Sequence, residues 1–274
     1  MLIMFSKDML QRCIVQYLSQ GLRGPTCRVA YWEVVNAILY KLKTGVQWHL
    51  LPVKSLIISD IISWNAVYHY FRKWCKDGSW RRAWTSLMKE YKALLDLSTV
   101  QLDGSHSPAK RGGEAVAYQG RKKCKTTNIL LLTDRNGLVV GCSKPVAGNH
   151  HDLYQINKQL KEIQDQLTEM DIGVNGLFLN ADAGFDAAKF RETLDKEGVT
   201  LNCPENRRNA SRLDSDIYLD EEMYKERFVV ERTNAWMDSF RSVLVRQDTT
   251  VASWQAWHFI AFTVWMMKHR IEKL

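Results

Sequence analysis

The sequence lacks the signatures of a membrane, secreted or zinc-binding protein. It has six cysteines but no C-x-x-C pair, so we expect free thiols in a reducing cytosol. The opening MLIMF is too short for the apolar core of a secretory signal and is soon interrupted by Lys7 and Asp8. The most apolar run, WHFIAFTVWMM at 257–267, is shorter than the about 20 residues that span a bilayer. It predicts a buried helix, and we expect a cytoplasmic protein.

Negative charge is scarce in the first third of the chain. Residues 1–95 carry 14 Lys and Arg against 5 Asp and Glu, whereas residues 96–274 carry 24 against 25. The whole excess behind the net charge of +8 therefore lies in the N-terminal part. A basic module joined to a nearly neutral one favours attraction of DNA by the first and acid-based chemistry in the second. Other soluble proteins can be equally lopsided, so this pattern alone does not decide the function.

Two aspartates stand where predicted strands end. STVQLDG at 98–104 and GLFLNADAGFD at 176–186 are runs of apolar β-formers that meet an acid and then glycine, which predicts strands ending at Asp103 and at Asp182. Ligands of open α/β sheets bind at the carboxyl edge of the strands, and carboxylate oxygens suit Mg²⁺. We therefore expect both aspartates at one shared metal site, which favours phosphoryl-transfer chemistry on nucleic acid.

A third acid, Glu231, lies in a stretch at 224–247 that has the spacing of a single helix. Arg227 precedes Glu231 by one turn, and an isolated pair of this kind is usually an i,i+4 ion pair worth about 0.2–0.5 kcal/mol. The two upstream aspartates make a role in the same site more plausible. One face of this helix would carry Tyr224, Arg227, Glu231, Asn234 and Asp238, while Phe228, Val229, Trp236, Phe240 and Val243 would pack into a core.

The chain resembles the bacterial insertion-sequence transposases of the DDE class, which have a ribonuclease H-like catalytic domain. The resemblance implies that Asp103, Asp182 and Glu231 are the catalytic, metal-binding acids, and that Tyr224 and Arg227 contact DNA. The Lys that often follows the glutamate by seven residues in this family is replaced here by Asp238. The motifs that carry the resemblance are WEVVNAILYKLKTGVQWHLLP (32–52), LDGSH (102–106), GRKKCKTTN (120–128), GNHHD (148–152), NADAGFD (180–186) and ERFVVERTNAW (226–236).

The same resemblance implies an activity and its partners. The protein would bind the terminal inverted repeats of an insertion sequence, cleave the DNA strand and transfer it to target DNA. The implied cofactor is a pair of Mg²⁺ ions, for which Mn²⁺ can substitute. Double-stranded DNA would be the partner, with a homodimer formed when two ends are synapsed and with an association with the nucleoid. Two alternatives stay open: a metal-dependent nuclease that cuts without joining, and an inactive, domesticated DNA-binding protein.

Residues 1–95 are expected to form a helical DNA-binding domain, and residues 96–274 a mixed α/β catalytic domain. Amphipathic helices are predicted within 5–21, 29–45 and 59–78, which is compatible with a relative of the helix-turn-helix. An aromatic stripe, Trp64, Tyr68, Phe71 and Trp74, is expected to be core. The candidate DNA contacts, which could equally be a solvated face, are Arg72, Lys73, Lys76, Arg81 and Arg82.

Cations crowd the segment that follows Asp103. We expect a glycine-containing loop at 105–128 that clamps the phosphate backbone, although a flexible basic surface loop is equally compatible with its composition. A hairpin around Asp134–Gly137 follows, and then His150, His151 and Asp152. Asp152 is either a helix N-cap or an additional metal ligand. The six cations of the loop are Lys110, Arg111, Arg121, Lys122, Lys123 and Lys125.

The spacing between the last two acids limits the architecture. Only 49 residues separate Asp182 from Glu231. This span has room for about one helix, the strand VTLNC at 199–203 and a basic connection, but not for an inserted β-domain. The connection contains Arg207, Arg208 and Arg212.

Overall fold

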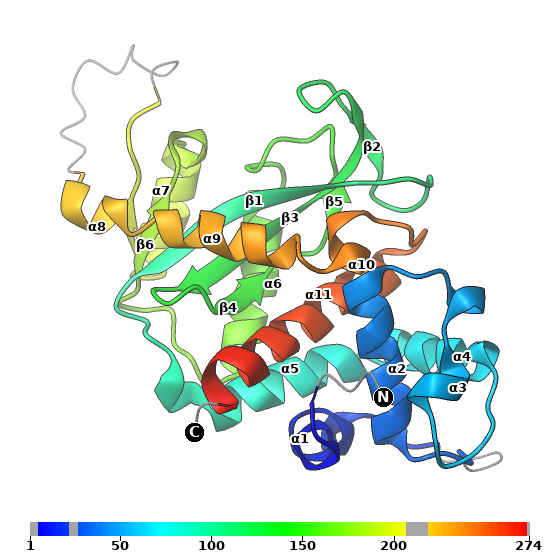
Figure 1. The fold of residues 1–274 in the computed structure, drawn as a ribbon. Coiled ribbons are helices and arrows are strands. Elements are labelled where there is room, and N and C mark those ends of the chain that lie inside the picture. Colours follow the sequence, from blue (N-terminus) through cyan, green and yellow to red (C-terminus); the bar gives the residue numbers. More distant parts are fainter. Residues whose placement is uncertain (1–4, 22–26, 207–218, 273–274) are drawn as a thin grey trace. The chain divides into compact units, whose positions relative to one another are not determined.

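The computed structural model describes residues 5–21, 27–206 and 219–272. Their contacts divide the chain into two compact units, drawn in Figure 1. The helical unit comprises Met1–Glu90, Lys110–Gly113 and Met237–Leu274, and the sheet unit comprises Tyr91–Ala109 and Glu114–Trp236. The C-terminal stretch from Met237 thus clusters with the N-terminal helices. The basic connection at 207–212 lies outside the described residues.

The helical unit is built around one helix that is apolar on every side. This helix, α11, is capped by the Thr250 hydroxyl, and its rings stack on neighbouring helices, Trp257 against Phe71 and Phe259 against Trp84. The apolar run therefore forms the expected buried helix. The elements are α1 (Lys7–Cys13), η1 (Val15–Tyr17), α2 (Tyr31–Thr44), η2 (Trp48–Leu50), α3 (Val53–Leu56), α4 (Trp64–Lys76), α5 (Ser79–Glu90), α10 (Arg241–Leu244), α11 (Val251–Met266) and η6 (Met267–Ile271).

The aromatic stripe of α4 is only half core. Phe71 and Trp74 are fully buried, as predicted. Tyr68 and Trp64, one and two turns before Phe71, are half-buried and line a cavity instead. Ser63 caps the helix by accepting a hydrogen bond from the amide of Ala66, which fixes where α4 begins.

The sheet unit holds a mixed seven-stranded sheet in the order β2-β3-β1-β6-β7, with β4 and β5 also paired to β3. β1 runs antiparallel to β3 and parallel to β6, and β6 runs parallel to β7. This is the mixed α/β architecture expected from the sequence. The elements are η3 (Lys92–Leu94), β1 (Val100–Pro108), β2 (Ala117–Gln119), β3 (Cys124–Asp134), β4 (Val139–Cys142), β5 (Val146–Ala147), α6 (Ile156–Glu169), β6 (Phe178–Ala181), η4 (Ala183–Phe185), α7 (Ala188–Lys196), β7 (Thr200–Asn202), α8 (Glu221–Lys225) and α9 (Phe228–Met237).

The two faces of β1 meet different elements. Val100 and Leu102 share an apolar space with side chains of α6 and α7, such as Ile163 and Leu194. Because side chains alternate along a strand, Asp103 points to the other face. There it meets Asn234 of α9. Figure 1 shows α9 crossing this face, with α6 on the opposite one.

The hairpin between β3 and β4 forms where it was predicted. Gly137 adopts a positive φ of 86° in its turn, and its amide donates to the carbonyl of Asp134 at 3.0 Å. The buried Asp134 carboxylate accepts from the amides of Asn136 and Leu138. Within the described ranges, no helix combines the length and the apolar character that crossing a bilayer requires.

Candidate active site

Asp103 and Asp182 follow directly on the last parallel pair of the sheet. β1 and β6 pair from Val100↔Leu179 to Leu102↔Ala181, so the two aspartates are the next residue on each strand. β6 ends at Ala181, one residue before the predicted end at Asp182. β1 does not end at Asp103, contrary to expectation, because its antiparallel ladder with β3 continues to Pro108. The two carboxylates therefore stand where β1 and β6 part, rather than at two strand ends.

Burial makes the negative charge at this point costly. The pKa of the Asp103 carboxyl is raised to about 6, first by burial, and further by the nearby Asp182 and Asp152 carboxylates, while Arg227 opposes the rise. The Asn234 amide donates to Oδ2 of Asp103 at 3.3 Å. A partly buried carboxylate beside others is an environment that a divalent cation would relieve.

Asp182 is held by its own turn. Its Oδ1 accepts from the amide of Gly184 at 2.8 Å as the N-cap of the short helix η4. Its carbonyl oxygen accepts from the thiol of Cys203, just after β7, at 3.0 Å. These contacts hold Asp182 in its turn beside β7.

Glu231 lies on α9 one turn before Asn234, the residue whose amide contacts Asp103. It extends from the first turn of α9, its side chain is 55% exposed, and its Oε1 stands 3.3 Å from the guanidinium of Arg227. The ordinary i,i+4 ion pair is therefore present in the structure. Over the described ranges, no group of three His, Cys, Asp or Glu side chains is arranged to hold one metal ion. Asp103 and Asp182 thus follow the last pair of β1 and β6, while Glu231 is paired with Arg227.

The expected single helix at 224–247 is in fact three helices. It breaks at Glu226 and Arg227, between α8 and α9, and again before α10. The break also rotates Phe228 into solvent, where it is 68% exposed, although it was expected in the core. Of the other expected core positions, Phe240 and Val243 are buried, while Val229 and Trp236 are half-buried.

The break between α8 and α9 places Tyr224 and Arg227 beside the aspartates. Burial raises the pKa of the Tyr224 hydroxyl, with Arg227 lowering it and Asp182 raising it. Arg227 also acts electrostatically on Asp103. The two residues named for DNA contact therefore share the electrostatic environment of both carboxylates.

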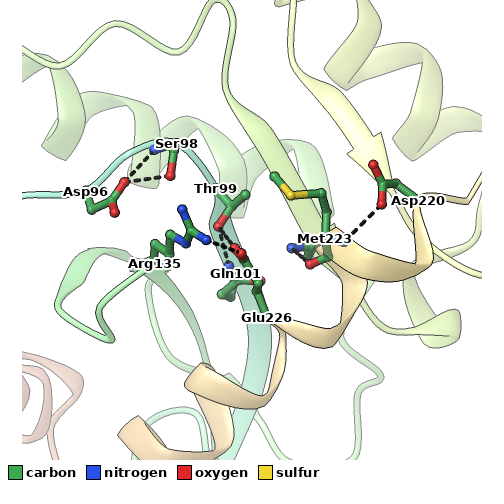
Figure 2. A network of polar contacts seen from close by, with 9 residues as sticks. Asp96, Ser98, Thr99, Gln101, Arg135, Asp220, Met223 and Glu226 are labelled. Atoms are coloured by element: carbon green, nitrogen blue, oxygen red, sulfur yellow. Dashed lines mark hydrogen bonds and ion pairs between the residues drawn. The ribbon is translucent and has the colours of Figure 1, made fainter.

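A polar network ties this break to β1, and sequence reasoning missed it (Figure 2). The carboxylate of Glu226 accepts from the buried Thr99 hydroxyl at 2.7 Å and pairs with Arg135 at 2.6 Å. The Gln101 amide in turn donates to the Thr99 hydroxyl at 3.1 Å. The signal in the sequence was the alternation of polar Thr99 and Gln101 with apolar neighbours on a predicted strand, which places both on the Asp103 face.

Two asparagines hold the preceding helix, α8. Asn180 of β6 donates to the carbonyl of Met223 at 2.9 Å. Asn202 of β7 donates to the carbonyl of Asp220, whose carboxylate caps α8. Both asparagines are buried and are bonded to one another. The Tyr224–Arg227 segment is thus fastened to the sheet at both ends.

Asp152 also reaches the carboxylate pair. Its Oδ1 accepts from the buried Asn128 amide at 2.6 Å, and a Cβ on Gly104 would approach that oxygen to 2.1 Å. The close approach needs a glycine directly after Asp103. Asp152 is not the N-cap of the following helix, because α6 begins only at Ile156 and its N-cap residue is Gln155.

The cations of the expected loop belong to different elements. Half of the segment is strand, because β1 extends to Pro108 and the β2–β3 hairpin follows, so the expectation of one loop over 105–128 is wrong. Lys110 and Arg111 fall within the helical unit. The remaining cations lie in the sheet unit, in the β2–β3 turn or at the start of β3, and all are exposed: Arg121, Lys122, Lys123 and Lys125.

Comparison with known proteins identifies the class. Among solved structures, the chain is similar to the piggyBac transposase in a synaptic complex with hairpin DNA, at 11% identity over 94% of this chain and 71% of that one, with a TM-score of 0.50. This likeness supports the fold, a ribonuclease H-like α/β fold preceded by helices. The Mos1 transposase in a paired-end complex with the left transposon end is a weaker match, at 12% identity over 80% of each chain with a TM-score of 0.29.

The family follows from the sequence profile of the chain. Residues 89–267 match the family described as the transposase DDE domain, and residues 8–84 match that of putative transposases of the IS4/5 family. The chain therefore belongs to the DDE transposases, enzymes that cleave DNA and transfer strands with divalent metal. None of the curated proteins matches it.

Proposed function

We propose that this transposase binds the terminal inverted repeats of an insertion sequence and performs cleavage and strand transfer at Asp103, Asp182 and Glu231, with two Mg²⁺ ions. The observation that supports the proposal best is the placement of Asp103 and Asp182 side by side where β1 and β6 part. The raised pKa of Asp103 adds to it, since burial of a carboxylate near others has a cost that a cation removes. Oxygen ligands of this kind suit Mg²⁺ and Mn²⁺.

In this proposal, bound divalent ions would supply activation of the attacking hydroxyl and stabilisation of the leaving oxygen. Glu231 would exchange its pairing with Arg227 for the metal site. The exchange costs little, because an i,i+4 ion pair on an exposed helix is worth about 0.2–0.5 kcal/mol. Arg227, once released, would hold a backbone phosphate as a bidentate fork, and Tyr224 would contact the backbone beside it.

The exposed cations would hold the DNA near these carboxylates. Arg121, Lys122, Lys123 and Lys125 in the sheet unit, and Lys110 and Arg111 in the helical unit, would contact phosphates, which position a duplex without reading its sequence. Synapsis of two transposon ends would bring two copies of the chain together as a homodimer.

The test uses the full chain, Mg²⁺ and DNA that carries the inverted repeats flanking its gene. Asp103→Ala and Asp182→Ala should each abolish cleavage, because the metal site loses a ligand, and should leave binding to the repeats largely unchanged. Asp195→Ala, which removes an exposed carboxylate from α7, is the matched control and should cleave like the wild type. Cleavage at the wild-type rate by either active-site variant would remove that residue from the site.

A second substrate distinguishes a transposase from a nuclease that cuts without joining. DNA ends that already expose 3′-hydroxyls should be inserted into a target plasmid by the wild type. Cleavage without any insertion would favour a nuclease, and repeat binding without either reaction would favour an inactive DNA-binding protein.

A further inference from the structure

The motif at 32–52 has no role in the proposed chemistry, yet its end forms part of a cavity. This cavity lies entirely within the helical unit and has a volume of about 460 Å³. That volume falls within the roughly 300–1,000 Å³ of sites that bind small molecules. The side chains that determine its character are Trp48, His49, Trp64, Tyr68, Arg72 and Arg111.

Aromatic rings form one side of the cavity. The Trp48 ring packs against two buried rings, with its centre 5.2 Å from that of Phe71 and 6.0 Å from that of Trp257. The Tyr68 ring stands 5.0 Å from that of Trp48. Trp64 and Tyr68 are half-buried, so part of each ring is accessible to a flat ligand. Rigid aromatic surfaces of this kind bind planar heterocycles by stacking.

Positive charge forms the other side. The Arg72 guanidinium lies 6.0 Å from the centre of the Tyr68 ring and 3.4 Å from its hydroxyl. Arg111, from the segment Lys110–Gly113, also lines the cavity. The one lining carboxylate, Asp248, accepts from the Trp257 indole at 3.0 Å and acts on the lining Lys41. Lys41, Arg246 and Arg72 all act on its charge. The lining still holds three cations, Lys41, Arg72 and Arg111, against this one carboxylate, which favours an anion.

We propose that this cavity receives one unpaired nucleotide of the DNA substrate, with its base stacked on the aromatic side and its phosphate on Arg72 and Arg111. A planar ring joined to an anion is the chemistry that matches both sides, and the Gln47 and Gln247 amides at the rim could bond to the edge of a base. Paired bases keep their faces inside the duplex, so only an unstacked nucleotide fits. DNA as the source of this nucleotide rests on the proposed function.

The experiment compares three duplexes of the same sequence bound to the full chain. One is fully paired, one carries a single extra unpaired nucleotide, and one carries an abasic residue at that extra position. We expect the unpaired nucleotide to bind about tenfold more tightly than its abasic counterpart, which is the scale of one base stacked on aromatic side chains. With 2-aminopurine as the extra base, binding should quench its fluorescence.

Variants assign the effect to the cavity. Trp64→Ala should abolish both the tenfold preference and the quenching, whereas Trp64→Phe, which keeps a ring, should retain most of each. Arg72→Gln should weaken the base-bearing and abasic duplexes equally, because both keep the phosphate. Tyr118→Ala removes an exposed aromatic from the sheet unit and is the matched control, expected to behave like the wild type. Melting temperatures equal to that of the wild type show that the variants are folded. If Trp64→Ala does not fold, the comparison uses Trp64→Phe in its place.

Three outcomes would overturn the inference. The first is equal affinity for the base-bearing and abasic duplexes, and the second is a preference that survives Trp64→Ala. The third is that a free nucleoside monophosphate displaces the duplex with the unpaired nucleotide and the fully paired duplex at the same concentrations. That result would indicate a site for a small molecule. Cleavage of repeat DNA is measured separately, so a base preference without Mg²⁺-dependent cleavage would reject the proposed function and leave the nucleotide pocket standing.

Discussion

At the scale of single residues, the Asp103 carboxylate destabilises the fold when it is ionised, because it is buried. Its folded-state pKa of about 6 is above the value of 3.8 for an unperturbed aspartate, chiefly because the carboxyl is buried. The stability associated with this group is complete below the unfolded-state pKa and is lost as the pH rises through about 6. A structural role would favour a neutral side chain here, whereas a metal site requires the carboxylate.

The sign of this linkage predicts a stabilising substitution. Asp103→Asn should stabilise the metal-free protein at pH 7, raising its free energy of unfolding by on the order of 1–3 kcal/mol and with it the melting temperature. At pH 4 the substitution should change the stability little. Thermal unfolding of both proteins from pH 4 to pH 7 measures the difference in their stability. The contributions of the other titrating groups cancel in this difference, because both proteins share them. Adding Mg²⁺ at pH 7 should stabilise the wild type more than the variant. A variant less stable than the wild type at pH 7 would contradict this account.

At the scale of elements, the junction between α8 and α9 determines where Tyr224 and Arg227 lie. Glu226 anchors that junction to β1 through the Thr99 hydroxyl. Thr99→Val removes the hydroxyl at nearly constant volume. We expect the cleavage rate to fall roughly tenfold, because a displaced phosphate-binding residue lowers the rate without removing any metal ligand. The fold should lose only about 1 kcal/mol of stability.

The readout that separates positioning from folding is the maximal cleavage rate at saturating DNA. Glu222→Gln is the matched control, since Glu222 is an exposed acid of α8 that pairs with Lys225 on the same helix. It should cleave like the wild type. If Thr99→Val left the maximal rate unchanged at equal stability, the network would be only structural.

The elements also show what local sequence patterns report. β6 is a short apolar run, and its end at Ala181 lies one residue from the end predicted at Asp182. The position of Asp103 inside β1 depends on a ladder with β3, more than twenty residues away, which a local pattern cannot contain. At the break before α9, Glu226 accepts a hydrogen bond from the distant Thr99. Periodicity predicted a continuous helix there, because it carries no information on nonlocal hydrogen bonds.

At the scale of the whole molecule, the net charge of +8 predicts a strong dependence of DNA binding on salt. The exposed β2–β3 turn should contribute part of it. Substituting both Lys122 and Lys123 by Ala should weaken binding alike for repeat and unrelated DNA. The slope of log affinity against log salt should fall by about 0.9 for each phosphate that the variant no longer neutralises. Lys158→Ala and Lys189→Ala together, at exposed cations of α6 and α7, form the control pair. An unchanged slope in the Lys122 and Lys123 variant would exclude the turn from the DNA interface.

The composition of the two units was only partly predictable. The helical character expected of residues 1–95 follows from local periodicity. The mixed sheet was implied by the resemblance to the DDE transposases. The return of the chain after Met237 to the helical unit does not follow from local periodicity, because α11 is apolar all round and its pattern does not indicate which helices cover it.

The central claim is that Asp103, Asp182 and Glu231 bind divalent metal together, and Mn²⁺ located by anomalous diffraction in crystals of the full chain with repeat DNA tests it most directly. We expect an anomalous peak bound by the Asp103 and Asp182 carboxylates, with Glu231 turned from Arg227 onto the same site and Arg227 on a phosphate. Absence of a peak at the aspartates, or a peak there with Glu231 still paired to Arg227, would contradict the account.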